Sequence, residues 1–382
     1  PGTLVLQRGQ LVVPGGKSLT ITSSNRNAAT AVIDGNDTSR IFLVEAGADV
    51  AVEGLTVTGG NSRDDYWAGG ILNYGTLNFN SSILTDNIGG YGGGVRNEGV
   101  LIVRESIVSD NISVASSGSG IWSSGALTVV DSTITRNRNS DSGSGYGGGI
   151  LNTGTANIVR STIHDNTVSK GGGGIQNTGE MVILASSITD NGGSQFGGGG
   201  IRNFGTLTVT DTTVSGNTTA YRNGGKGGGI ENGGTLILNG DTIITGNTGR
   251  LGGGLYTYDG SVDVGDTTTI TANTATERGG GIYNSGGTVR IGPYASVTGN
   301  TPDDYYEPCD TEWDAVGYWC FDYYSNPIDD GVGYNDAALF GPTFDTGDSA
   351  PTPDNRASLD FNGTTDYAEV ADRGGSDNLD SF

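Results

Sequence analysis

A six-residue phrase, Ser/Thr-x-apolar-Ser/Thr-x-Asn, recurs along the chain and limits its possible folds more than any other feature. An early, looser version ends at Asn61. The regular versions are separated by 24 to 30 residues and end at Asn87, Asn111, Asn137, Asn166, Asn191, Asn217, Asn247, Asn273 and Asn300. Self-similarity with a period of about 20–50 residues indicates stacked repeats and not an ordinary globular domain.

Each period has the same internal order. It opens on Gly-Gly-apolar-x-Asn, as in Gly69 to Asn73, and continues with alternating apolar residues such as Leu77 and Phe79. The Asn-ended phrase then supplies a third strand, with Leu84 pointing inward. Strands this short can bury an apolar face only by stacking on the next repeat. The sequence therefore predicts an all-β parallel β-helix of about twelve three-strand coils, spaced about 4.8 Å apart.

The recurrent Asn residues have a physical role in such a solenoid. Backbone groups lose ladder partners where a coil turns, and a buried Asn can bond both to them and to the Asn of the next coil. We predict one Asn ladder at the end of the third strand. A second ladder is predicted at the first corner, interrupted by Ser123 and Thr257, from Asn73, Asn97, Asn152, Asn177, Asn203, Asn232 and Asn284. Replacing one inward Asn with Leu should cost roughly 1–3 kcal/mol.

These phrases resemble the repeats of polymorphic outer-membrane-type surface proteins and, more widely, those of the pectate-lyase-like group. The resemblance covers about residues 40–300. It implies a right-handed single-stranded parallel β-helix over residues 1–300, less regular in 1–60 and regular in 61–300. Such folds serve adhesins, structural rods, lyases and hydrolases, so the resemblance implies the fold more than the activity.

Charge and hydropathy limit the classes of partner that the chain could bind. The chain has 42 Asp and Glu against 19 Lys and Arg, a net charge of −23. Nucleic acid is excluded as a partner because phosphate binding needs a basic surface. No apolar run approaches the roughly 18 residues of a membrane helix, so we expect no membrane insertion within this chain. Two cysteines favour, weakly, an extracellular location.

The C-terminal part differs from the repeats. Residues 301–355 are acidic and aromatic, and we predict a cap or linker there with a disulfide between Cys309 and Cys320. An aromatic glycan- or partner-binding site is the alternative. The stretch Ala357–Val370 resembles the opening strands of laminin-G-like, concanavalin-type modules. It implies an incomplete module over residues 356–382, completed by further sequence or by a neighbouring chain.

Acidic residues precede four of the ladder Asn residues: Asp86, Asp110, Asp165 and Asp190. Carboxylates on adjacent coils would approach the spacing of a retaining glycosidase pair, or could bind Ca²⁺. However, Arg136 sits within the row, and Asp is a common turn residue. We therefore assign no catalytic residue and no cofactor, with this row the candidate Ca²⁺ site and a solvated corner the preferred interpretation. His164 replaces a Ser or Thr and is expected to face solvent.

The outward positions of the first strand favour a contact surface, because they include Trp122, Tyr256 and Tyr283 and no acidic cluster. We expect these side chains to be exposed. The leading hypothesis is an extracellular, bacterial cell-surface protein, a structural or adhesive rod able to assemble head-to-tail into a fibre or sheath. Its partners would be itself or cell-surface glycans and proteins. The alternatives are a polysaccharide lyase or glycoside hydrolase, or a glycan-binding module without turnover.

Overall fold

The computed structural model describes residues 2–308, except 8, 25–26, 64–66, 141–144, 194–196 and 220–223, together with strands at 337–340 and 367–370. The chain divides into two units, Pro1–Asp304 and Tyr305–Phe382. Cys309 and Cys320, the predicted disulfide, lie outside the described residues, as does the boundary predicted at residue 355. No helix among the described residues is long and apolar enough to cross a membrane.

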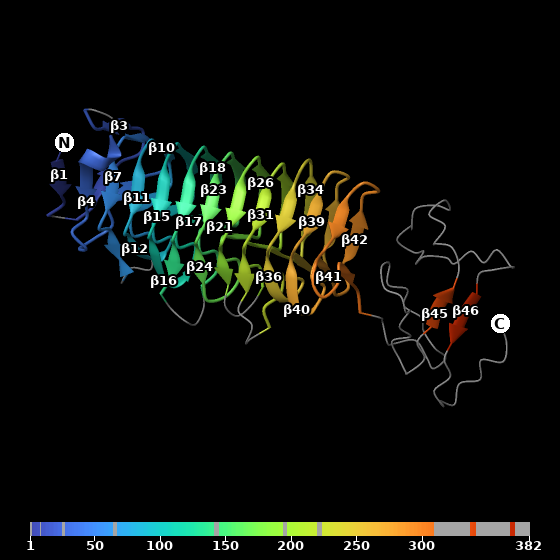
Figure 1. Cartoon of the computed structure of the whole chain (residues 1–382). Coiled ribbons are helices and arrows are strands. Elements are labelled where there is room, and N and C mark those ends of the chain that lie inside the picture. The colour runs from blue at the N-terminus through green and yellow to red at the C-terminus, as the bar shows by residue number, and fades with distance from the viewer. Residues whose placement is uncertain are drawn as a thin grey trace. The chain divides into compact units, whose positions relative to one another are not determined.

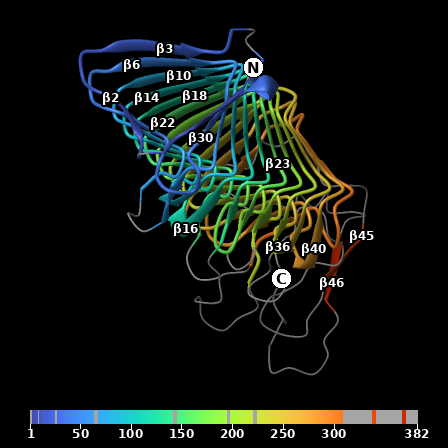
Figure 2. The ribbon, with the colours of Figure 1, turned by 90° about the vertical axis from the view of Figure 1, so that its left-hand side faces the viewer.

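The first unit is a parallel β-solenoid in which every coil lies over the previous one (Figures 1 and 2). It contains almost no helix; the 3-10 turn η1 spans Ala28–Thr30. Four parallel sheets, here called A to D, run along it. The predicted all-β solenoid of stacked repeats is therefore confirmed. Along a regular coil the chain visits sheets B, C, A and D in that order.

The strands of sheet A end just before the phrase-ending Asn. The strands of sheet B end at the first-corner Asn. Sheet A consists of β1 (Gly2–Val5), β4 (Ala31–Asp34), β7 (Thr56–Thr58), β11 (Ile83–Thr85), β15 (Ile107–Ser109), β19 (Thr133–Thr135), β23 (Thr162–His164), β27 (Ser187–Thr189), β31 (Thr213–Ser215), β35 (Ile243–Thr245), β39 (Thr269–Thr271) and β43 (Ser296–Thr298). Sheet B includes β2 (Leu11–Val13), β5 (Phe42–Val44), β9 (Ile71–Asn73), β13 (Val95–Asn97), β17 (Ile121–Ser123), β21 (Ile150–Asn152), β25 (Ile175–Asn177), β29 (Ile201–Asn203), β33 (Ile230–Asn232), β37 (Leu255–Thr257) and β41 (Ile282–Asn284).

Sheet C holds the longer alternating strands, and sheet D follows the phrase-ending Asn. Sheet C consists of β3 (Ser18–Thr22), β6 (Asp49–Glu53), β10 (Thr76–Asn80), β14 (Val100–Arg104), β18 (Ala126–Val130), β22 (Thr155–Val159), β26 (Glu180–Leu184), β30 (Thr206–Thr210), β34 (Thr235–Asn239), β38 (Ser261–Val264) and β42 (Thr288–Ile291). Sheet D consists of β8 (Asn61–Ser62), β12 (Ile88–Tyr91), β16 (Ile112–Ser117), β20 (Arg138–Asn139), β24 (Thr167–Val168), β28 (Gly192–Gly193), β32 (Thr218–Thr219), β36 (Thr248–Leu251) and β40 (Thr274–Arg278).

Sheet D corrects the prediction of three strands per coil. Its segments were expected to be loops, and several are only two residues long, such as Gly192–Gly193. Such segments are too short to show the period-two alternation that marks a strand. They pair because the preceding Asn holds them in place: the amide of Ile112 donates to the carbonyl of Asn87 one coil earlier, at 2.8 Å.

The core consists of columns of equivalent apolar residues. Leu77 and Phe79 are each 1% exposed and pair in register with Leu101 and Val103 of the next coil. Full burial of such a side chain contributes roughly 1.5–3 kcal/mol relative to exposure. The alternating strands predicted from the sequence therefore define the interior of the solenoid.

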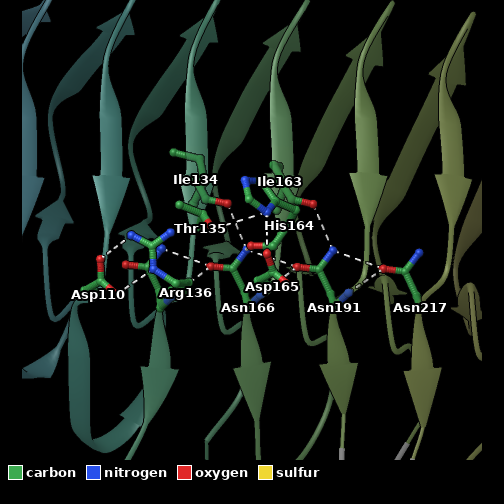
Figure 3. A network of polar contacts seen from close by, with 11 residues as sticks. Asp110, Ile134, Thr135, Arg136, Ile163, His164, Asp165, Asn166, Asn191 and Asn217 are labelled. Atoms are coloured by element: carbon green, nitrogen blue, oxygen red, sulfur yellow. Dashed lines mark hydrogen bonds and ion pairs between the residues drawn. The ribbon is translucent and has the colours of Figure 1, made fainter.

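The predicted Asn ladder is confirmed. From Asn87 to Asn300 each side-chain Nδ2 donates to Oδ1 of the next Asn, at 2.9–3.0 Å, as Figure 3 shows for Asn166, Asn191 and Asn217. The ladder ends where Asn300 donates to Asp304 Oδ1, at 2.8 Å. The early phrase is shifted: Asn61 pairs with Ile88 in sheet D, and Gly60 occupies the ladder position.

A further ladder escaped prediction. The residue that opens the phrases from Ser82 to Thr242 is a buried Ser or Thr, and its hydroxyl accepts a backbone amide from the previous coil, as Ser132 Oγ does from Ser106 N at 3.1 Å. The series runs through Ser82, Ser106, Ser132, Ser161, Ser186, Thr212 and Thr242. Sheet A is therefore bordered by a hydroxyl ladder on one edge and the Asn ladder on the other.

The first-corner ladder is formed and is broken where expected, at Ser123. Asn97 Nδ2 donates to Ser123 Oγ at 3.0 Å, but Ser123 Oγ itself donates to Gly125 O. The buried Oδ1 of Asn152, on the next coil, has no hydrogen-bond partner among the described residues. The short Ser side chain cannot bridge the gap that an Asn amide spans elsewhere, as between Asn152 and Asn177 at 2.8 Å.

We therefore expect Ser123→Asn to stabilise the solenoid by about 1 kcal/mol, the net value of one restored hydrogen bond. The new Nδ2 would donate to Asn152 Oδ1, and the new Oδ1 would accept from Asn97. Urea unfolding followed by circular dichroism measures the gain. Ser123→Ala, which also loses the acceptor for Asn97, is the matched control and should destabilise. Equal stabilities for the two variants would contradict the ladder-gap interpretation.

The second unit is described only at three short strands: β44 (Tyr305–Tyr306), β45 (Ala337–Phe340) and β46 (Tyr367–Val370). β45 and β46 pair antiparallel, with Ala337 opposite Val370 and Phe340 opposite Tyr367. β46 falls within the segment 356–382 for which the sequence predicts laminin-G-like strands.

Candidate functional site

The outward positions of sheet B form one column along the solenoid. They are Leu72, Arg96, Trp122, Leu151, Gln176, Arg202, Glu231, Tyr256 and Tyr283. The connections that lead from sheet D back to sheet B contribute side chains that lie over this column. Lys226 Nζ, for example, donates to the hydroxyl of Tyr256 at 2.9 Å.

The prediction that the side chains of this face are exposed is wrong for Tyr256, which is only 2% exposed. Trp122 and Tyr283 are half-buried. Leu72 and Leu151 are likewise buried. The sequence placed these residues correctly on the outer face of the strand. The side chains that cover them come from connections whose path depends on the tertiary fold.

Towards the N-terminal half, Arg96 is held between aromatic rings. Its guanidinium lies 4.2 Å from the ring centroid of Trp67 and 4.7 Å from that of Trp122. Its Nη2 also lies 2.6 Å from Glu98 Oε1. Stacking on aromatic faces and pairing with a carboxylate together saturate this cation. This cluster therefore fastens the connection to the sheet.

Towards the C-terminal half, the same face opens into a recess of about 510 Å³. It is lined by Gly197, Arg202, Gly224, Lys226, Glu231, Tyr256, Tyr258 and Asp259. Tyr256 stacks on Tyr283 with ring centroids 5.3 Å apart and Lys226 lies over the Tyr256 ring at 4.6 Å. Aromatic walls with a few convergent polar groups are typical of small-ligand sites. We call this the tyrosine recess.

A buried ion pair forms one side of the tyrosine recess. Arg202 Nε lies 2.5 Å from Glu231 Oε2, and the Glu231 side chain is 5% exposed. Burial raises the pKa of the Glu231 carboxyl above its usual range, and the opposing charge of Arg202 reduces that rise. Burial, followed by the charge of Glu231, also raises the pKa of the neighbouring Tyr258 hydroxyl. The tyrosine recess therefore contains a buried carboxyl whose partner is a largely buried cation.

Sequence reasoning missed Lys226 and Tyr258 of the recess, and Trp67 of the arginine cluster. A pattern in the sequence could have identified part of this set. The residue just before the Gly-rich phrase is repeatedly aromatic or basic, as at Tyr91, Tyr146 and Lys226. Those residues lie next to glycines that have positive φ, such as Gly92, Gly147 and Gly227. The sharp turn there directs the chain back onto sheet B.

The acidic row proposed for Ca²⁺ has a backbone explanation. Asp86, Asp110, Asp165 and Asp190 all have φ between 55° and 57°, and their counterparts Arg136 and Ala272 have similar values of 53° and 54°. Asp, Asn and Gly tolerate this left-handed conformation best, which accounts for Asp or Gly before most ladder Asn residues. The row therefore marks a turn that the fold requires.

The charges in that row also engage neighbouring side chains. Arg136 binds Asp110 in bidentate fashion, with Nε and Nη2 at 2.9 and 2.7 Å from the two carboxylate oxygens, and this hydrogen bonding lowers the pKa of Asp110 (Figure 3). His164 is half-buried on the outer face of sheet A, and its Nδ1 lies 2.7 Å from Asp165 Oδ2. Within the described ranges, no three His, Cys, Asp or Glu side chains gather as metal ligands would.

Comparison of the chain with protein families, with curated proteins and with solved structures found no match.

Proposed function

We propose that the protein is a structural or adhesive rod of the bacterial cell surface, which contacts glycans through the tyrosine recess. The observation that carries the proposal is the continuous Asn ladder from Asn87 to Asn300. Each coil of the solenoid depends on its neighbours for buried hydrogen bonds, which favours a stiff spacer. A stiff spacer holds a binding site at a distance from its anchor.

The chemistry of the tyrosine recess suits a sugar. Tyr rings offer an apolar face with a polar tip, so they can pack on a sugar ring while bonding its hydroxyls. Lys226 and Asp259 supply a donor and an acceptor at the rim of the recess, and Tyr258 is half-buried beside them. The lining balances two cations, Arg202 and Lys226, with two carboxylates, Glu231 and Asp259, so both neutral and uronic-acid glycans are tested below.

The extracellular location rests on resemblance. The Gly-Gly-apolar and x-x-Asn phrases resemble polymorphic outer-membrane-type surface repeats, and the pectate-lyase-like group acts on extracellular polysaccharides. The laminin-G-like stretch in 356–382 resembles modules of extracellular adhesion proteins. Together these resemblances support a protein that works outside the cell.

Self-association is the second contact that we propose. The first coil exposes apolar side chains: Leu4, Val12 and Leu19 are 56%, 48% and 42% exposed. They lie on β1, β2 and β3, which are the terminal strands of their sheets. Exposed apolar side chains on terminal strands favour contact with a further strand, which a second copy of this chain can supply by head-to-tail stacking.

A carbohydrate-active enzyme is the competing function, favoured by one observation. Glu231 is a desolvated acid beside Lys226 and Tyr256, and perturbed acids in recesses mark catalytic sites in many enzymes. The Asp86 to Asp190 row lends this alternative less support, because its residue types follow from the left-handed turn.

Binding and turnover can be tested in one experiment. The full chain is applied to immobilised neutral and uronic-acid polysaccharides, and both retention and released products are measured. We expect retention without products, reduced at least about tenfold by Tyr258→Ala. Tyr294→Ala is the control, because Tyr294 is 81% exposed and outside the recess. Products whose release is abolished by Glu231→Gln would establish the enzyme instead, and absence of retention on every polysaccharide would refute the glycan contact.

A further inference from the structure

Sheet A carries a second surface that is separate from the tyrosine recess. Its central residues point inward, so the flanking residues form two outward columns. The first column is Thr56, Ile83, Ile107, Thr133, Thr162, Ser187, Thr213, Ile243, Thr269 and Ser296. The second column is Thr58, Thr85, Ser109, Thr135, His164, Thr189, Ser215, Thr245, Thr271 and Thr298. Within it, Ser109 and Thr135 are buried, at 4% and 3% exposed.

The composition of these columns is specific to sheet A. Between Thr56 and Thr298 they hold Thr, Ser and Ile, with His164 as the single titratable member. The outward positions of sheet C in the same solenoid include charged residues, among them Arg104, Glu180 and Arg290. The general preference of strands for Thr applies to both sheets and does not explain the difference.

The backbone spacing of the array is regular in both directions. Equivalent backbone positions on neighbouring coils are about 4.8 Å apart, and the two columns start from Cα atoms about 6.6 Å apart along each strand. Hydroxyls that bond to one another lie closer, as Ser109 Oγ does to Thr85 Oγ1 at 3.1 Å and Ser296 Oγ to Thr298 Oγ1 at 3.3 Å. Side-chain ladders help a sheet of many strands to stay untwisted. Sheet A has them on both edges, the hydroxyl ladder through Ser186 and the Asn ladder through Asn191. Its register runs without a shift from β11 to β43.

The hydroxyls of this array can bind ordered water. A β-branched Thr on a strand is restricted in χ1, so its hydroxyl and methyl groups are held in place. Among the described residues, no protein group bonds the side-chain hydroxyls of Thr189, Thr245 or Thr271. Each hydroxyl can both donate to and accept from water. An array of such hydroxyls, regular at the backbone in two directions, can present bound water in an ordered pattern, as a crystal face of ice does.

We propose that the outward face of sheet A binds the surface of ice crystals. The part from Thr213 to Thr271 is the best suited, because Gly216, Gly246 and Ala272 border it. Earlier coils carry charged side chains at that border, such as Asp110 and Arg136, whose hydration shells do not fit an ice lattice. The methyl groups of Thr and Ile exclude disordered water from the same plane.

Ice affinity of the full chain tests this inference. Fluorescently labelled protein is slowly frozen onto a cold probe, and the fraction taken into the ice is measured alongside crystal shape under a microscope. We expect uptake and faceted crystals for the unmodified chain. The double change Thr245→Lys with Thr271→Lys, on adjacent coils, should lower uptake at least about tenfold.

The matched control is Thr208→Lys with Ile237→Lys, which places the same charges on adjacent coils of sheet C. It should leave uptake unchanged. If the sheet A double variant fails to fold, by circular dichroism, Thr271→Tyr gives the same test by steric bulk alone. Exclusion of the unmodified chain from ice, or equal loss in the sheet A and sheet C variants, would overturn the proposal.

Discussion

Replacing Asn166 with Leu is expected to destabilise the solenoid by about 3–5 kcal/mol, since each buried group left unpaired costs about 1–3 kcal/mol. Asn166 Oδ1 accepts from both the backbone amide and the side chain of Asn137, each at 3.0 Å. Its Nδ2 donates to Ile134 O at 2.9 Å and to Asn191 Oδ1 at 3.0 Å (Figure 3). Leu matches the size of Asn but satisfies none of these groups.

Urea unfolding followed by far-ultraviolet circular dichroism measures this loss. Asn239→Leu is the matched control, because Asn239 is exposed on sheet C and its change should stay within about 0.5 kcal/mol. If Asn166→Leu proves no more costly than Asn239→Leu, the ladder does not stabilise the fold.

The second large effect is expected from Gly200→Ala, at about 3 kcal/mol of destabilisation. A Cβ at Gly200 would lie 2.7 Å from the carbonyl oxygen of Gly229 on the next coil and 2.9 Å from Cγ of Asn217. Neither atom can move away easily. The Gly229 oxygen is part of the backbone, and the Asn217 side chain is held by its hydrogen bonds in the Asn ladder. The added methyl must therefore push two coils apart.

Gly192→Ala, at the end of the preceding coil, is the control for this prediction. A Cβ there would meet nothing closer than Cγ2 of Thr167, at 3.6 Å, and Gly192 does not have a positive φ. Both changes reduce the freedom of the unfolded chain equally, which by itself stabilises by about 0.4–1 kcal/mol. The difference between the two unfolding midpoints therefore isolates the clash. Equal midpoints would refute close coil packing at the Gly-rich corner.

Much of the candidate site could be anticipated, and the missing part has a definite physical cause. Trp122, Tyr256 and Tyr283 were placed on one outer column because period two is a local property of a strand. The burial of Tyr256 could not be predicted from this local pattern, because Lys226, which contacts it, lies 30 residues earlier in the sequence. Contacts of that range depend on the path of a connection, which carries no periodic signal.

The acidic row shows the opposite case. Asp86 to Asp190 were a candidate Ca²⁺ or catalytic row, with a solvated corner preferred, because a sequence shows side chains and not torsion angles. Their φ values near 55° show that the turn selects Asp and Gly there for conformational reasons. The hydroxyl ladder was overlooked for a related reason, since the sequence does not show whether the hydroxyl of a Ser or Thr is buried.

By itself, the sequence determined that the chain is a solenoid, which residues face its interior and, apart from the shifted phrase at Asn61, where the Asn ladders run and break. These features repeat in every coil, so local patterns of period two and of 24 to 30 residues record them. Only the tertiary structure decided that sheet D exists, that side chains from the connections cover sheet B, and that Arg202, Lys226 and Glu231 meet in one recess. Those features arise from contacts between coils and between non-equivalent positions, whose energies depend on geometry that no single repeat encodes.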